Sequence, residues 1–266
     1  MKLTHKQKQQ TGFTLIELMV SVAIFVAISG AIFGLLGQSQ KSFRTESQLL
    51  SAFQEARLGL DQIVNDANST GYPPLNHFAV TPLASQYAIG PVGWQPGYVA
   101  AIPCTIGTAG GGTCATPGDY DVVFEGDFND GAGVQWIRYQ LVGTTLFRGT
   151  APKVVGSDPV TATNAAGMLP YVTNVMNNPG AAQIGLIKAA YPAMFPGGVA
   201  QPIFQFTCDT AAGTVLCQNA GASNSPSNVR DIQVVLIVQT TQRDAQTGKL
   251  RLVQLNGRGH RINPNQ

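Results

Sequence analysis

The chain has 266 residues, of which 44% are hydrophobic and 11% charged, and its formal net charge is +2. This size and apolar content suffice for one sizeable globular core in addition to an apolar N-terminal segment. Three of the lysines precede Gly12, so the rest of the chain carries 13 basic against 14 acidic residues, a net of −1. That balance excludes the strongly basic character by which proteins attract nucleic acid or anionic lipid.

The N-terminus combines a basic leader with a long apolar run. Residues 1–12 are polar and basic, and Phe13–Leu36 follows directly. As a helix these 24 residues would be about 36 Å long, enough to cross a bilayer. The positive flank holds the N-terminus in the cytoplasm. No small-residue cleavage site with a polar stop follows the run, so cleavage before it would leave the helix attached as an anchor.

Glu17 is the single ionisable residue in this run. A charge there costs about 2.5 to 3.5 kcal/mol on insertion scales, so we expect a functional residue with a partner. The sequence Gly12-Phe13-Thr14-Leu15-Ile16-Glu17 resembles the type III signal of type IV pilins and type II secretion pseudopilins. This resemblance implies that a membrane peptidase cuts between Gly12 and Phe13 and methylates the new amine. The alternative is an ordinary signal anchor with a chance glutamate.

Glu17 would be the fifth residue of the mature chain, close to its new N-terminal ammonium group. A carboxylate at that distance can offset the charge in its own helix or in a neighbouring one. When helices stack with an axial stagger, Glu17 of one subunit can meet the Phe13 amine of the next. We therefore predict an assembly role for Glu17, with processing at Gly12 independent of it.

One helix is expected over residues 13–67, about 80 Å long, with an amphipathic second half. Residues 68–71 and two prolines after them predict its end. Three glycines in the apolar half indicate either close helix approach or local loosening, or only the usual frequency of glycine in membrane helices. They are Gly30, Gly34 and Gly37. The stripe expected to contact the head is Leu49, Phe53, Ala56, Leu60, Ile63 and Ala67.

The head, residues 68–266, is expected to be β-rich and to give the chain an α+β fold. An antiparallel sheet would pack one face on the amphipathic half of the helix. Residues 72–118 and 149–202 are rich in Gly, Pro and Ala and predict long loops, with short elements near 169–175 and 182–190. Strands are predicted at 121–125, 134–141, 145–148, 203–208, 213–218, 231–240 and 250–255.

Part of the head resembles the PilW minor pilins and, more distantly, the J-type minor pseudopilins of type II secretion. The resemblance rests on Asp119-Tyr-Asp-Val-Val-Phe, Asp127-Phe-Asn-Asp-Gly, Trp136-Ile-Arg-Tyr-Gln-Leu and Leu146-Phe-Arg. The segment Leu169-Pro-Tyr-Val-Thr-Asn-Val is also similar, but the gap from it to Phe204 is longer than in that family.

The four cysteines form two local pairs in a chain with an export-type N-terminus, which favours disulfides. Three pairings are possible, and we favour Cys104 with Cys114 and Cys208 with Cys217, since glycines inside each short loop allow a tight reversal. The alternative is a four-cysteine zinc site, but the usual spacing of two to four residues between paired ligands is absent.

Two further features of the head were considered as binding sites. Asp127, Asn129 and Asp130 offer oxygen ligands for calcium, but the spacing fails the EF-hand pattern, and such residues before glycine are ordinary turn formers. The last 24 residues are basic without interleaved aromatic residues, which favours a solvated strand face or a subunit contact over nucleic-acid binding. These basic residues are Arg243, Lys249, Arg251, Arg258, His260 and Arg261.

No catalytic motif or cofactor fingerprint is present in the sequence, so we expect neither an enzyme nor a cofactor. The pattern favours a minor pilin that is inserted in the inner membrane, processed by a prepilin peptidase and built into a type IV pilus, with an initiation or tip role. Its expected partners are major and minor pilin subunits and the inner-membrane assembly platform. The alternatives are a minor pseudopilin of type II secretion and a membrane-tethered periplasmic enzyme or adhesin.

Overall fold

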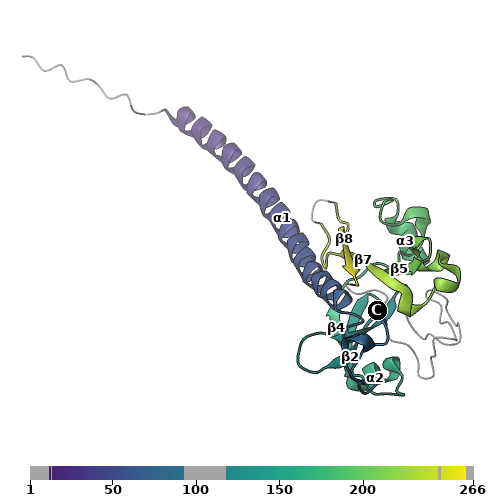
Figure 1. The fold of residues 1–266 in the computed structure, drawn as a ribbon. Coiled ribbons are helices and arrows are strands. Elements are labelled where there is room, and N and C mark those ends of the chain that lie inside the picture. Colours follow the sequence, from purple (N-terminus) through teal and green to yellow (C-terminus); the bar gives the residue numbers. More distant parts are fainter. Residues whose placement is uncertain (1–11, 13, 93–117, 245–246, 262–266) are drawn as a thin grey trace, which may run out of the picture.

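The structure is a computed structural model that describes residues 12, 14–92, 118–244 and 247–261. A long helix, α1, projects from a head built of two antiparallel sheets (Figure 1). The α+β class predicted from the sequence is confirmed, with the helix packed on antiparallel sheet.

Helix α1 runs from Leu15 to Asn68, a length of 54 residues or about 80 Å. It is continuous through the three glycines of its apolar half, so the loosening considered there does not occur in this structure. Ser69 caps its C-terminus, and Gly71 follows in the left-handed region with φ of 78°. The predicted helix end is therefore confirmed to within one residue.

The first sheet has the strand order β1-β2-β3-β4. The β2–β3 hairpin turns at Gly143, whose φ of 60° suits a residue without a Cβ. Sequence reasoning missed α2, a helix that packs on β2 and β3. The elements are β1 Asp121–Asp127, β2 Val134–Val142, β3 Thr145–Pro152, α2 Pro159–Ala166 and β4 Leu169–Val172.

The second sheet has the order β6-β5-β7-β8. Its last strand begins and ends later than predicted, at Leu252 and His260 instead of 250 and 255. The meander expected along the helix is thus two sheets, linked by a bridge between Val175 and Val238. The remaining elements are α3 Ala181–Ile187, β5 Phe204–Thr210, β6 Gly213–Leu216, β7 Val229–Gln239 and β8 Leu252–His260, with short 3₁₀ turns at Leu75–His77, Pro196–Gly198, Cys217–Asn219, Gly221–Ser223 and Pro226–Asn228.

The main core lies between the last turns of α1 and the inner faces of the two sheets. The predicted helix stripe is buried from Ala56 to Ala67, while Leu49 and Phe53 are only partly covered. Helix and strand approach closely where β8 carries glycine: a Cβ on Gly259 would lie 2.3 Å from the Ala67 Cβ. A smaller cluster around Ile237, Phe195 and Met176 covers the other side of β7.

Strand β2 is buried on both faces. Ile137 and Tyr139 face the main core, and Trp136 and Arg138 face the other way, as the alternation predicted. The second face is nevertheless covered too, because Arg138 bonds Asn164 of α2 and Trp136 donates to Glu125 Oε2 at 2.8 Å. Strand β2 is therefore enclosed on both faces, whereas β3 and β4 keep exposed positions.

Candidate assembly site

The N-terminal end of α1 places Glu17 against Thr14. The Glu17 Oε2 atom accepts hydrogen bonds from the Thr14 backbone N at 2.9 Å and from Thr14 Oγ1 at 2.8 Å. Thr14 Oγ1 in turn accepts from the Glu17 backbone N at 3.4 Å. This reciprocal capping box satisfies donors that a helix start otherwise leaves without partners. Sequence reasoning missed Thr14, although the pattern Thr-x-x-Glu is the ordinary signal for such a cap.

The cap gives Glu17 a partner within its own chain. The isolated helix therefore does not leave this carboxylate without hydrogen bonds, contrary to what a lone charge in an apolar run suggested. Both side chains are exposed, and a carboxylate can accept further bonds. Gly12 is exposed as well, and Phe13 lies outside the described residues. Because Thr14 follows the predicted cut, the cap would persist in the mature chain, one residue from its amine.

The apolar half of α1 is uncovered by the head. Among the described residues α1 is the one helix that is long and apolar enough to cross a membrane, and its most apolar stretch has no buried residue. Gly30, Gly34 and Gly37 have no neighbouring side chain or backbone within 4 Å of a Cβ built on them. This segment can therefore meet lipid or other helices along its whole circumference.

A second apolar stripe lies beyond the membrane-length segment. Phe43, Leu50 and Leu58 are 73%, 59% and 72% exposed, respectively. At about 100° per residue they fall on the side of the helix opposite the buried Ala56 and Ile63. The stripe is about 22 Å long at 1.5 Å per residue. We call these three residues the outer stripe, and neither the head nor a bilayer of about 30 Å thickness covers them.

The comparison with known proteins bears on this end of the chain. Residues 7–33 match the family model of the prokaryotic N-terminal methylation motif. The chain thus carries a prepilin signal of the type IV pilin-like kind, and the match includes Gly12, Phe13 and Glu17. Such a signal implies processing by a prepilin peptidase, membrane anchoring and assembly with other pilins or pseudopilins. No curated protein and no solved structure matches the chain.

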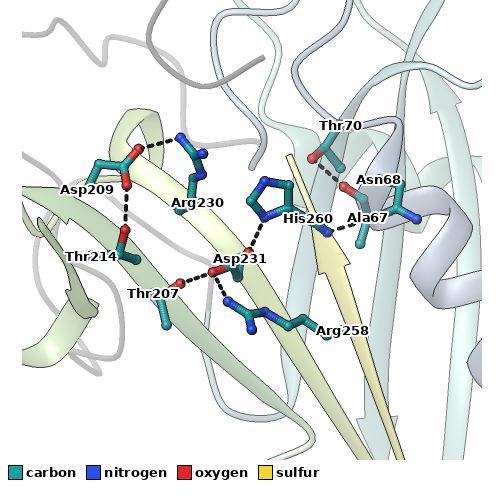
Figure 2. Close-up of polar contacts among 10 residues, drawn as sticks. All are labelled: Ala67, Asn68, Thr70, Thr207, Asp209, Thr214, Arg230, Asp231, Arg258 and His260. Atoms are coloured by element: carbon teal, nitrogen blue, oxygen red, sulfur yellow. Dashed lines mark hydrogen bonds and ion pairs between the residues drawn. The ribbon is translucent and has the colours of Figure 1, made fainter. Parts of the chain in front are cut away.

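The head contains a polar cluster around Asp231, drawn in Figure 2. Asp231 is 1% exposed and accepts hydrogen bonds from Thr207 Oγ1 at 2.9 Å and from Arg258 at 2.5 Å, and it contacts His260 Nδ1. Burial raises the pKa of Asp231, but the hydrogen bonds from Arg258, His260 and Thr207 outweigh it and hold the pKa below its usual value. The His260 backbone N also donates to Asn68 Oδ1 at the end of α1.

The Asp231 and His260 pair resembles two members of a hydrolytic triad, but the described residues supply no activated hydroxyl. The Thr207 hydroxyl donates to Asp231 itself, and the Thr70 hydroxyl donates to the Ala67 carbonyl (Figure 2). A nucleophile has to lie within hydrogen-bond reach of the imidazole. The contacts of Asp231 instead connect β7 to Thr207 in β5 and to Arg258 and His260 in β8, and the His260 backbone connects β8 to the end of α1.

The second cysteine pair forms the predicted bridge. Cys208 in β5 and Cys217 just after β6 are joined by a disulfide, which confirms the local pairing there. Both residues are buried in the main core. Cys104 and Cys114 lie outside the described residues.

The calcium candidates form turns in the β1–β2 connection. Asp127 Oδ1 accepts from the Asn129 backbone N, and Asp130 Oδ1 accepts from the Ala132 backbone N, both at 2.9 Å. Hydrogen bonds from Ala132 and Gln135 lower the pKa of Asp130. Asn129 has a φ of 60°, which asparagine tolerates. Within the described ranges no group of three acidic, His or Cys side chains is placed to hold a metal ion.

Three of the six C-terminal basic residues contact carboxylates within the head, namely Arg251, Arg258 and His260. Arg251 pairs with Asp244, and Arg258 pairs with Asp231. Arg261 is mostly buried, and burial lowers its pKa. Lone basic charges are thus fewer at this end than the sequence suggests, and the hypothesis of nucleic-acid binding gains no support from the geometry.

Proposed function

We propose that this protein is a minor pilin, a structural subunit that enters a type IV pilus through α1 and acts at assembly initiation or at the tip. The observation that carries the proposal is the match of residues 7–33 to the methylation motif at the exposed end of an uncovered helix. Its partners would be the prepilin peptidase, major and minor pilin subunits and the inner-membrane assembly platform. We further propose that it is not an enzyme and needs no cofactor.

The outer stripe supports assembly through helix contacts. Three large apolar side chains are exposed on one side of the helix beyond the membrane-length segment, and exposed apolar surface of this kind is typical of a contact with another protein. A neighbouring helix of similar character would cover them, in continuity with the apolar segment before them. The proposed filament contact therefore extends past the membrane segment toward the head.

A minor pseudopilin of type II secretion remains the second candidate, because the same motif serves both machines. The genes beside this one discriminate between them: pilus assembly genes favour the first function, and secretion genes favour the second. Shearing provides the matching observation. A chain that starts at a methylated Phe13 and occurs in sheared surface filaments supports the pilus, whereas confinement to the cell envelope supports the secretion system.

The direct test is Glu17→Gln in the full chain. We expect normal cleavage at Gly12 and at least about tenfold less chain in sheared filaments, since one lost charge contact of about 1.4 kcal/mol is tenfold in an equilibrium. Mass spectrometry of the mature N-terminus and immunoblots of filaments measure the two effects separately.

The control for this test is Ser21→Ala, which removes a neighbouring exposed hydroxyl bonded to the Glu17 carbonyl but keeps the carboxylate. It should assemble like the parent. Normal incorporation of the Glu17→Gln chain would overturn the assembly role, and failed cleavage would show that Glu17 acts in processing instead.

A further inference from the structure

A groove lies beside the C-terminal end of α1, away from the membrane-length segment. It consists of two cavities of about 400 and 540 Å³ that share Tyr72 and Asp127 in their walls. The first lies over the end of α1 at Asn68–Gly71, and the second lies between the segment after Pro73 and the start of β2. We call the two together the distal groove. Neither the assembly helix nor the Asp231 cluster accounts for it.

Aromatic rings line one wall of the distal groove. Tyr72 and His77 meet edge to face with ring centroids 5.3 Å apart, and His77 and Phe78 do so at 5.4 Å. Tyr72 is 44% exposed although it lies beside the end of a buried strand. Rings held in this way offer flat apolar faces to a ligand at low entropic cost, since their orientation is already fixed by their neighbours.

Uncharged and acidic polar groups complete the groove. Asp127 is held in place because its backbone N donates to the Tyr72 carbonyl at 2.7 Å and its Oδ1 accepts from Asn129 N at 2.9 Å. Asn129, Ser85 and Gln86 also line the two cavities. A carboxylate and amides beside aromatic rings match a ligand with many hydroxyl groups and exposed C–H faces.

The charge of the groove argues against an anionic ligand. Among the described lining residues Lys153 is the one lysine or arginine, and it is buried. Its Nζ is already bound to Glu125 Oε1 and to the Tyr87 carbonyl, each at 2.8 Å. A phosphate or sialic acid would therefore face Asp127, and the His77 imidazole would be the one other described lining group able to carry a positive charge.

A peptide ligand fits the groove less well than a saccharide. The exposed aliphatic side chains nearby, Leu75, Val80 and Leu83, line neither cavity. The aliphatic residues that do line the second cavity are Pro73 and Val134, which are buried, and Ala132 and Pro152, which are small, so an apolar anchor residue would find little aliphatic surface there.

We propose that the distal groove binds a neutral saccharide, with sugar C–H faces on Tyr72 and His77 and hydroxyls donating to Asp127. This binding goes beyond the proposed assembly role and does not depend on it. The groove adjoins the C-terminal end of α1, which is the end of the helix away from the membrane-length segment.

The test uses the full chain in dodecylphosphocholine micelles, because maltoside detergents carry a sugar that would compete. Saturation-transfer NMR and calorimetry are run with cellotriose, maltotriose and chitotriose, and with 3′-sialyllactose as the anionic probe. We expect at least one neutral trisaccharide to bind with Kd of about 1 mM or lower, as suits an open groove with few contacts. Sialyllactose should bind at least about tenfold more weakly.

Substitutions in the groove test whether the saccharide binding measured by NMR and calorimetry takes place there. Tyr72→Ala and His77→Ala should each weaken binding about tenfold without shifting the thermal midpoint, while Leu186→Ala removes an exposed side chain of α3 that lines neither cavity and should leave sugar binding unchanged. Absence of binding by all three neutral sugars at about 10 mM would overturn the proposal. Equal affinity for sialyllactose, or full binding by both groove variants, would also contradict it, and none of these results affects the Glu17 test.

Discussion

Asp231 is almost completely buried although it lies on the outer face of its sheet. The side chains that cover it are its own partners Arg258 and His260, each more than half exposed. Its lowered pKa therefore depends on hydrogen bonds that reach it from the surface. Such a carboxylate stabilises the fold while it is charged, and this contribution is lost on protonation because the ionic hydrogen bonds that offset its burial depend on the charge.

This arrangement predicts the response to acid. In the unfolded chain Asp231 has a pKa near 3.8, and folding lowers it. Its contribution to stability is present above that pH and is lost as the pH falls through the lower pKa of the folded state. In Arg258→Gln the folded-state pKa rises, so the midpoint of acid unfolding should move up by about half a pH unit or more. Tryptophan fluorescence against pH measures the shift.

The control for the acid experiment is Arg57→Gln. Arg57 pairs with Asp61 on the helix surface at 3.9 Å, and both side chains are about two-thirds exposed. An exposed pair of this kind contributes little. If Arg258→Gln and Arg57→Gln unfold at the same pH as the parent, the Asp231 cluster does not govern acid stability.

At the scale of the elements, α1 packs on β8 and β7 and also contacts β4. Glycines lie at the closest of these contacts, with Gly257 and Gly259 in β8 and Gly59 in α1. A Cβ on Gly259 or Gly257 would meet Ala67 or Val64, and a Cβ on Gly59 would lie 2.4 Å from Val172 Cγ2. These glycines let the backbones of helix and sheet approach more closely than any larger residue permits. The angle between α1 and the head is thus fixed by contact at short range.

Gly259→Ala should therefore destabilise the head by about 1 to 3 kcal/mol, because the added methyl overpacks against backbone and Cβ atoms that cannot move away. Gly185→Ala in α3 is the matched control, since nothing lies within 4 Å of its Cβ. It should be neutral or stabilise the protein by up to about 1 kcal/mol. Denaturant titration compares the two. Equal stabilities would show that α1 can shift away from β8.

Local periodicity predicted most of these elements and failed where longer-range effects decide. The alternation at 121–125 and 231–240 and the helix breakers at 68–71 predicted two strands and a helix end, and the structure has β1 at Asp121–Asp127, β7 at Val229–Gln239 and the helix end at Asn68. Helix α2 was missed because its eight residues lack an apolar period, although Asp158 followed by Pro159 is a usable start signal. The division into two sheets depends on contacts between distant residues, which no local pattern encodes.

The same contrast holds for the candidate site. The leader, the glycine and the apolar run predicted the processing signal, and the methylation motif agrees. The Thr14 cap was readable from the sequence but missed, whereas the outer stripe was not predictable. Its three residues are recognised as an exposed apolar stripe only when the structure shows that the head covers the opposite side of α1. The distal groove likewise joins Tyr72 to Asp127, which are distant in sequence.

At the scale of the whole molecule, one buried carboxylate joins the assembly helix to the first sheet. Asp66 in the last turns of α1 accepts from Tyr139 Oη at 2.6 Å, Arg148 Nη2 at 3.1 Å and Gln62 Nε2 at 2.7 Å. Burial, and the charge of Asp66 beside it, hold the pKa of Tyr139 well above its ordinary value. Together with the contacts to β8, this network fixes the helix to both sheets.

Asp66→Ala should destabilise the folded chain by about 3 to 5 kcal/mol, since it leaves the partly buried Arg148 and the buried Tyr139 hydroxyl without their acceptor. The thermal midpoint should fall by about 10 °C. Asp61→Ala on the exposed side of the same helix should cost less than about 1 kcal/mol. Circular dichroism melts distinguish them. Similar melting of the two variants would mean that Asp66 does not hold the head to its stalk.

The edge strands of the two described sheets are β1, β4, β6 and β8, and each is either short or bordered by another part of the chain. β1 is bordered by Gly71 and Tyr72, which exchange backbone hydrogen bonds with it, and β8 lies under α1. β4 and β6 have only four residues each, and the disulfide at Cys217 ends β6. A protein concentrated in a membrane or a filament meets many copies of itself side by side. Short or bordered edges make it harder for those copies to join sheet to sheet, which is consistent with the proposed contact through the helix.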